Sequence, residues 1–256
     1  MIAHRLPVSG LDVVVELPTG AEDVLLVEAG PPSLELALAL LGRVVRRRDG
    51  AAIDWLALAP TDIDVLLLAL RRRVLGDVIA TDLYCAAPAC RARVDLSFSI
   101  AAFVAHHRPE PPAALRVADD GWFRLDDEVE FRLPRAADQL AIALEAEPER
   151  ALAVRCIRPA EVSAAARAQV EDAMEALAPS LLSELQGTCS ECGATVTAEF
   201  DPLQYTLREL RDQARDIYAD VWAIAASTHW SEADILALPT ARRLRYAELV
   251  HDRAAT

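Results

Sequence analysis

The stretch "YCAAPAC" (Tyr84–Cys90) holds two cysteines on either side of a proline, and the rest of the chain is best understood from it. A second tight pair stands in "CSEC" (Cys189–Cys192), and only one further cysteine, Cys156, occurs in the sequence. In a reducing compartment, cysteines at such short spacings hold a metal ion more often than they form disulfides. The two pairs therefore favour a metal site built from distant parts of the chain.

The paired cysteines are a suitable ligand set for zinc, because structural zinc sites use four thiolates in a closed tetrahedron. We predict one structural Zn²⁺ bound by Cys85, Cys90, Cys189 and Cys192. Disulfides within the pairs and unpaired structural thiols are the alternatives that the spacing leaves open. Cys156, in "AVRCIRP", is expected to lie alone on a strand and to be buried.

Around the cysteine pairs, the chain shows the same features twice. "LPTGAEDVLLVEA" (Leu17–Ala29) corresponds without gaps to "LPRAADQLAIALE" (Leu133–Glu145), and each stretch follows a short apolar run. After each cysteine pair, apolar residues alternate with polar ones over 94–100 and 194–200, which is typical of a half-buried strand. Four features in one order favour an internal duplication over chance similarity.

The resulting expectation is an α+β fold of two related strand-helix-knuckle-strand halves, joined at a shared four-cysteine zinc site and followed by a helical C-terminal segment. The expected boundaries are 1–105 for the first half, 106–121 for a Pro-rich linker, 122–201 for the second half and 202–256 for the C-terminal segment. "HHR" at the start of the linker predicts solvent-exposed histidines at positions 106 and 107.

Two long helices are readable between these landmarks. "PTDIDVLLLALRRRVLGD" (Pro60–Asp77) has an apolar face, and Thr61 with Asp64 three positions later fits a capping box. "PAEVSAAARAQVEDAMEALAPSLLSEL" (Pro159–Leu185) is the corresponding helix in the second half, and we expect it to break near Pro179.

The C-terminal segment predicts a helix that starts at Asp201 and Pro202. Its apolar residues step by four and three over three heptads, which is typical of a helix that docks on a partner. The residues expected to bind that partner are Leu203, Leu207, Leu210, Ile217, Val221, Ile224 and Trp230. An amphipathic helix lying on its own domain is the alternative. Ser231 and Asp234 then form a capping box, and Thr240 caps the last helix.

Composition narrows the function classes. The chain of 256 residues carries a formal net charge of −14, which repels phosphate backbones and makes nucleic-acid binding unlikely. Two arginine clusters, at 43–48 and 71–73, fit solvated helix ends. No secretory signal and no apolar run long enough for a membrane span is present, so we expect a soluble, cytoplasmic protein without a membrane partner.

No catalytic motif stands out in the sequence. The chain has nine glycines but no phosphate-binding glycine loop, no HExxH and no nucleophile elbow. A zinc ion held by four thiolates has no open position for a substrate. The sequence therefore predicts a protein that is not an enzyme.

Three stretches resemble the T4-type baseplate proteins of phage tails and related contractile injection systems: "HRLPVSGLDVVVELPTGAEDVLL" (His4–Leu26), "DWLALAPTDIDVLLLALRRRVLGD" (Asp54–Asp77) and "STHWSEADILALPTARRLRYAEL" (Ser227–Leu249). The resemblance implies a non-enzymatic baseplate component or baseplate/hub assembly factor whose partners are other baseplate, hub or tail-core proteins. Such a protein would be assembled into a phage-like tail particle. The zinc prediction comes from the four thiols and not from this resemblance. A zinc-ribbon regulator that contacts nucleic acid through the arginine clusters is the alternative.

Overall fold

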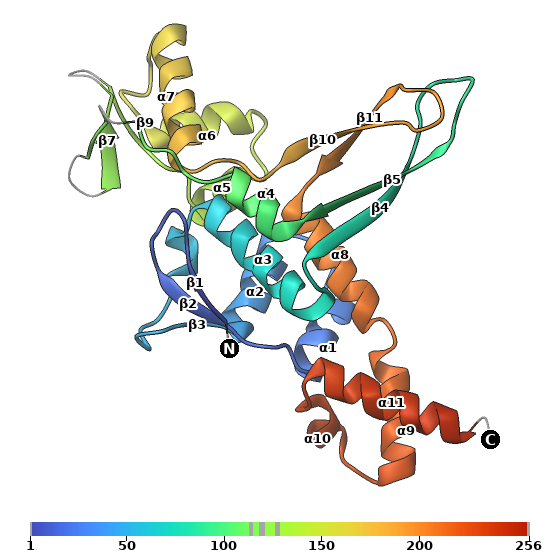
Figure 1. Cartoon of the computed structure of the whole chain (residues 1–256). Helices are drawn as coiled ribbons and strands as arrows, with labels where there is room; N and C mark the ends of the chain where they lie inside the picture. Colours follow the sequence, from blue (N-terminus) through green and yellow to red (C-terminus); the bar gives the residue numbers. More distant parts are fainter. Residues whose placement is uncertain (1, 113–114, 118–120, 126–128, 255–256) are drawn as a thin grey trace.

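The computed structural model describes residues 2–112, 115–117, 121–125 and 129–254. Short antiparallel sheets and helices alternate along the chain and form a mixed α and β structure (Figure 1). The expected α+β class is confirmed, but the expected strand-helix-knuckle-strand order is wrong, because a strand and not a helix runs directly into each cysteine pair. Part of the expected linker at 106–121 lies outside the described residues.

A first series of elements runs from residue 2 to residue 106. It begins with a three-stranded antiparallel sheet, in which two helices separate the second strand from the third: β1 (Ile2–Arg5), β2 (Asp12–Val15), α1 (Gly20–Glu28), α2 (Leu34–Val44) and β3 (Val45–Arg47). It continues with a 3₁₀ turn, a long helix, a hairpin and a short helix: η1 (Trp55–Ala57), α3 (Pro60–Leu75), β4 (Val78–Tyr84), β5 (Arg93–Ser99) and α4 (Ile100–His106).

A second series with a similar order, but with four strands in its sheet, runs between residues 116 and 214. Its antiparallel sheet comprises β6 (Arg116–Val117), β7 (Trp122–Arg124), β8 (Glu130–Arg132) and β9 (Ile157–Arg158). Two helices again separate the last two strands, and a long helix, a hairpin and a further helix follow: α5 (Ala136–Ile142), α6 (Pro148–Cys156), α7 (Ala164–Leu177), β10 (Ser183–Thr188), β11 (Thr195–Phe200) and α8 (Pro202–Ala214).

The helices that follow the two Leu-Pro dipeptides begin in the same way. In α1, the carboxylate of Glu22 accepts a hydrogen bond of 2.8 Å from the backbone N–H of Thr19. In α5, the carboxylate of Asp138 accepts one of 3.0 Å from the N–H of Arg135. Each bond satisfies an N–H that the helix itself leaves free. The two carboxylates occupy corresponding positions of the aligned stretches.

Each of these helix starts also docks on a similar segment elsewhere. The N–H of Gly20 donates to the carbonyl of Leu238, and the N–H of Ala136 donates to the carbonyl of Leu58. These carbonyls belong to the related sequences "LALPT" (236–240) and "LALAPT" (56–61). The contact is close at Gly20, where a Cβ would lie 2.9 Å from the Cα of Leu236, so only glycine fits there.

The main core lies where α3 and α8 pack together with α1, α2 and strand β2, and its buried members include Leu40, Leu66, Leu67 and Leu207. A second, aromatic core lies at the base of the two hairpins. There the ring of Phe200 contacts those of Phe98 and Phe103 at centroid distances of 5.1 and 5.2 Å. Because these rings come from both hairpin regions, they fix the two hairpins to one body, from which both hairpins project (Figure 1).

Three helices complete the chain: α9 (Ile217–Thr228), α10 (Glu232–Leu236) and α11 (Thr240–Ala254). They are held against α1 by a buried polar cluster. The guanidinium of Arg243 donates to Asp220 and, at 2.9 Å, to Asp23, while the hydroxyl of Thr240 donates to Asp23 at 2.8 Å. Among the described residues, no helix combines the length and the apolar character needed to cross a membrane.

The expected capping box at the start of α3 is wrong. The residue before the helix is Ala59, and the hydroxyl of Thr61 donates instead to the carbonyl of Pro179 at 2.9 Å. Asp62 accepts hydrogen bonds from the backbone N–H groups of Val8 and Ser9 in the turn between β1 and β2. A tertiary contact therefore uses the hydroxyl of Thr61 that the local pattern assigned to a cap.

Two further local expectations need correction. Cys156 is buried as expected, but it is the last residue of helix α6 and not part of a strand. His107 is half-buried rather than solvent-exposed, and its ring contacts the carbonyl of Phe103 at 2.9 Å and the hydroxyl of Ser183 at 3.1 Å. The helix α4 extends into the expected linker and brings this ring against strand β10.

Candidate metal centre

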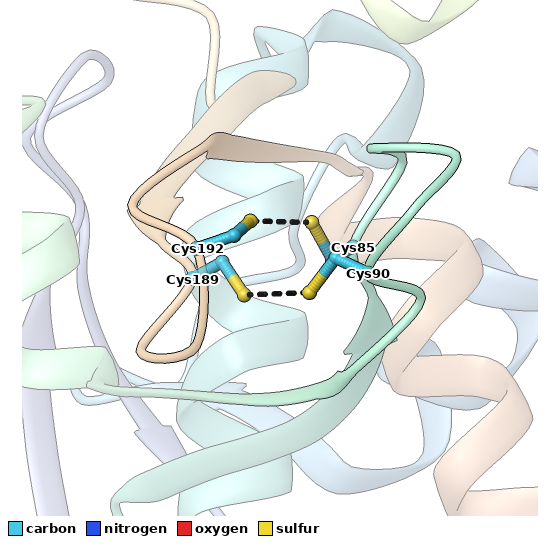
Figure 2. Close-up of side chains that lie close together, drawn as sticks. All are labelled: Cys85, Cys90, Cys189 and Cys192. Carbon is cyan, nitrogen blue, oxygen red and sulfur yellow. Dashed lines mark hydrogen bonds between the residues drawn. The ribbon is translucent and has the colours of Figure 1, made fainter.

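The four paired cysteines meet at the tips of the two hairpins. Their ligand atoms all lie within 4.8 Å of one another. Two contacts join the different hairpins: the Sγ atoms of Cys85 and Cys192 are 3.6 Å apart, and those of Cys90 and Cys189 are 3.8 Å apart (Figure 2). The prediction that these four residues form one cluster is confirmed.

The two turns that carry the cysteines have matching backbone geometry. The N–H of Cys85 donates to the carbonyl of Ala92, and the N–H of Cys189 donates to the carbonyl of Ala194, so each turn is closed two residues after its second cysteine. The residue directly after that cysteine has a positive φ in both turns, 50° at Arg91 and 71° at Gly193. This left-handed residue lets the chain reverse around the sulfur atoms.

Backbone N–H groups in these turns are aimed at the sulfur atoms. N–H groups of Cys192 and Glu191 face Cys189 and lower its pKa to about 7, because hydrogen bonds to the thiolate favour the charged form. The N–H of Ala87 faces Cys85 and that of Ala92 faces Cys90, and each lowers the pKa of its thiol, but burial and the neighbouring thiols together leave the pKa of both above the ordinary value. Such N–H groups stabilise negative charge on sulfur, which metal binding requires.

The cluster is closed on one side by apolar side chains. Cys85 and Cys189 are buried, Cys90 is half-buried and Cys192 is exposed. Val196 is buried with them, and Leu83 and Val94 pack against the same group. The sulfurs of Cys85 and Cys189 are therefore kept from bulk water, whereas those of Cys90 and Cys192 lie nearer the surface. This arrangement is compatible with a structural metal site that holds the ends of two hairpins together.

The geometry fits a four-coordinate metal ion. A tetrahedron with metal–sulfur distances of about 2.3 Å has sulfur–sulfur edges of about 3.8 Å, close to the two separations given above. A disulfide requires about 2.05 Å, and all five cysteines are free thiols in this structure. Within the described part of the chain, no other group of three or more histidine, cysteine or acidic residues is placed to hold a metal ion.

Most residues of the expected docking surface in the C-terminal segment are covered by the chain itself. Five of its residues are buried in the chain's own cores: Leu207, Leu210, Ile217, Val221 and Ile224. Leu203 packs against the main core as well. The seam is divided between α8 and α9, because α8 lies on α1 and α3 while α9 lies on α10 and α11. The apolar periodicity therefore reports internal packing, as the amphipathic-helix alternative described.

Trp230 keeps an exposed surface. Two other aromatic residues of the C-terminal segment, Tyr218 and Trp222, are also exposed, and neither belongs to the expected partner-binding set. Trp230 is 41% exposed, Trp222 is 74% exposed and Tyr218 is 47% exposed. Tyr218 and Trp222 lie one turn apart on α9, on the face opposite to the buried residues of that helix. In the sequence, Tyr218 and Trp222 can be recognised as aromatic residues at helix positions that do not belong to the apolar seam.

Comparison with protein-family models, with curated proteins and with solved structures found no match to this chain.

Proposed function

We propose that the chain is a non-enzymatic structural or assembly protein whose body is fixed by one structural Zn²⁺ at the four cysteines. The observation that carries this proposal is the convergence of four sulfur atoms from two hairpins within 4.8 Å. Zinc and iron both accept a tetrahedral set of four thiolates, and we favour zinc because it undergoes no redox chemistry and serves structural sites. A four-thiolate site leaves no position for a substrate.

The metal would join two duplicated halves. Support comes from the element order, which recurs from the sheet through the hairpin to the helix after it. It also comes from the matching helix starts at Thr19 and Arg135 and from the matching turns at Arg91 and Gly193. A metal ion shared by the two hairpins would hold the projecting ends together, and its binding free energy would contribute to folding.

The function of this rigid body is protein binding. An exposed tryptophan and tyrosine on α9 supply the aromatic area that is typical of interaction hot spots. The partner-binding surface that we now propose is Tyr218, Trp222 and Trp230, in place of the buried seam. Following the resemblance described above, the partners are baseplate, hub or tail-core proteins of a phage-like contractile tail or injection system.

The arginine cluster at 71–73 gives little support to the nucleic-acid regulator. Arg71 is buried and its guanidinium donates to Glu209 at 2.8 Å and to the carbonyl of Gly76 at 2.6 Å. Arg72 pairs with Asp77 at 2.8 Å, and Arg73 donates to the carbonyl of Val15. Arg71 and Arg73 are engaged within the fold and the exposed Arg72 is paired with a carboxylate, so this cluster is not a free phosphate-binding surface.

The proposal is tested by tagging the protein in its own host, sedimenting the lysate and identifying by mass spectrometry what travels with it. Co-sedimentation with sheath, tube and baseplate proteins would establish the tail role. Partners found only in light fractions without sheath would indicate an assembly factor that leaves the particle. Recovery with DNA or polymerase and without tail proteins would overturn the proposal in favour of the regulator.

Metal content is measured on the same purified protein. One zinc per chain, by inductively coupled plasma mass spectrometry, is expected. Iron at that stoichiometry would keep the clamp but change its ion, whereas a fully reduced protein purified without any bound metal would refute the metal-clamped body.

A further inference from the structure

A cavity of about 680 Å³ lies where the two series of elements meet the start of α8. Its walls come from the starts of α2 and α3, from α5 and α6, and from the segment between α7 and β10. Most of its surface is apolar, and the apolar side chains that line it include Ile63, Leu140, Leu152, Leu182 and Leu203. Its size and its position at a junction between structural units are typical of ligand sites.

The charged groups at this cavity all have the same sign. Glu35, Asp64 and Asp201 line it, and no arginine, lysine or histidine of the described chain does. Two of these carboxylates already have a local role: Asp201 accepts a hydrogen bond of 2.9 Å from the N–H of Gln204, and Glu35 interacts with Ser33 and with its own backbone. Both are therefore explained as helix-start residues.

Asp64 has no such role. It is half-buried inside the first two turns of α3, and within the described structure it has neither a hydrogen bond nor an ion pair. Burial, and to a smaller extent the negative charge of Asp201, raise its pKa to about 8. An acidic side chain kept partly out of water without a partner is costly to the fold, and such groups concentrate at functional sites.

An anion would not occupy this cavity. Three carboxylates would repel it, and at the starts of α2 and α8 the side chains of Ser33 and Asp201 already accept from backbone N–H groups that could otherwise bind an anion. A cation with an apolar stem satisfies both features of the cavity, since the stem contacts the leucines while the head reaches the carboxylates. Arginine fits best among protein side chains, because its planar guanidinium has five donors that can serve two carboxylates together.

We propose that this cavity binds an arginine side chain, carried by an apolar segment of a partner protein, with Asp64 and Asp201 as its acceptors. The inference rests on the proposed role as a protein-binding protein, and it names one feature of the partner. Binding draws Asp64 into its charged form, so a proton leaves the site as the guanidinium enters, and affinity rises between pH 6 and pH 9. The charge of the arginine itself does not change over this range.

The test uses the full zinc-loaded chain and the tripeptide acetyl-Leu-Arg-Leu-amide, titrated by isothermal calorimetry. The matched probe carries citrulline, which has the shape of arginine without its charge. We expect the arginine peptide to bind more than tenfold tighter than the citrulline peptide. Asp64→Asn should remove this difference, while Asp212→Asn, at an exposed acid of α8 outside the cavity, should preserve it.

A second measurement needs no variant. Titrations in buffers of different ionisation enthalpy should show proton release on binding at pH 7, and the affinity should increase at least fivefold from pH 6 to pH 9. Equal binding of the two peptides, no binding at 5 mM peptide, or no proton release would each overturn the arginine site. The co-sedimentation experiment can succeed when this one fails, because it reports on the whole surface and the peptide reports on this cavity alone.

Discussion

The Sγ atom of Cys90 lies 3.8 Å from that of Cys189, although the two residues are 99 positions apart in the chain. The contact joins two hairpins whose bases share the aromatic core around Phe200. The hairpins are thus fixed at one end by ring packing and would be fixed at the other by a metal ion. Without that ion, the tips would bring together sulfur atoms that attract one another only weakly.

Replacing Cys189 by Ser should remove the metal and destabilise the hairpin tips. The loss is expected on the order of 3–5 kcal/mol in unfolding free energy, because a serine hydroxyl does not replace a thiolate ligand. Zinc analysis and thermal unfolding measure both effects. Cys156→Ala is the control and should keep one zinc per chain, since Cys156 lies in helix α6 away from the cluster. A stable, metal-free Cys189→Ser protein would contradict the clamp.

Replacing Arg243 by Met should destabilise the chain strongly and in a pH-dependent way. Asp23 and Asp220 would remain buried without their cation, at a cost of roughly 3–5 kcal/mol near neutral pH. Burial already raises the pKa of both carboxyls, and without the arginine they protonate more readily, so the loss should be smaller at pH 5 than at pH 8. Urea unfolding at the two pH values measures this.

The control for that experiment is Arg245→Met. Arg245 pairs with Glu248 at 2.8 Å on the exposed side of α11, and exposed pairs contribute little. We expect a change below about 1 kcal/mol. Equal losses for the two variants would contradict the role of the buried cluster in holding α11 to α1.

Gly20→Ala should loosen the contact between α1 and the C-terminal helices. The new Cβ would lie 2.9 Å from both the Cα and the Cδ2 of Leu236, and a backbone atom cannot move away cheaply. We expect a loss of about 1–3 kcal/mol in a denaturant titration. Gly30→Ala serves as the matched change, because no atom lies within 4 Å of its Cβ position, and it should be nearly neutral. A neutral Gly20→Ala variant would show that the contact is adjustable.

Asp64→Asn should make the protein more stable, and more so at higher pH. The folded-state pKa of about 8 exceeds the ordinary value of 3.8, so the folded state holds a proton that the unfolded state releases between these pH values. The unfolding free energy of the unmodified protein therefore falls as pH rises from about 4 to 8, and the asparagine variant lacks this fall. Because Asp64 is only half-buried, we expect a gain of roughly 2 kcal/mol at pH 8.5 and little at pH 4.5. A destabilised variant would instead assign Asp64 a structural role.

Trp222→Ala should weaken partner binding without unfolding the chain. Its side chain is 74% exposed, so its removal costs the fold little, whereas loss of a hot-spot tryptophan lowers affinity more than tenfold. Leu210→Asp is the contrasting variant and should unfold the protein, because Leu210 is buried in the main core. Pull-down yield and circular dichroism separate the two effects. Unchanged recovery of partners with Trp222→Ala would exclude this surface.

The local elements were largely readable in the sequence. Period-two alternation after the cysteine pairs corresponds to β5 and β11, and the apolar run after Pro60 corresponds to α3. The start of α8 at Asp201 and Pro202 was also readable, since the carboxylate of Asp201 caps the helix as expected. These features depend on neighbours within a few positions, which a sequence pattern records directly.

Local patterns were insufficient where a side chain had a distant partner. Thr61 and Asp64 have the spacing of a capping box, but Thr61 bonds to Pro179 and Asp64 faces a cavity. The seam from Leu207 to Ile224 has the spacing of a docking helix, but α1 and α3 cover one part and α10 and α11 cover the other. Periodicity identifies an apolar face and does not identify what covers it.

The sequence by itself determined the chemistry of this protein: four thiols in two tight pairs, a strongly acidic composition, and the strand that follows each pair. Only the tertiary structure decided which groups meet. It placed the Sγ atoms of Cys85 and Cys192 3.6 Å apart, buried Arg243 between two carboxylates, and left Asp64 without a partner among the residues that the structure describes. The physical reason is that residue type and spacing fix what a side chain can bond, whereas packing of distant segments fixes what lies within reach.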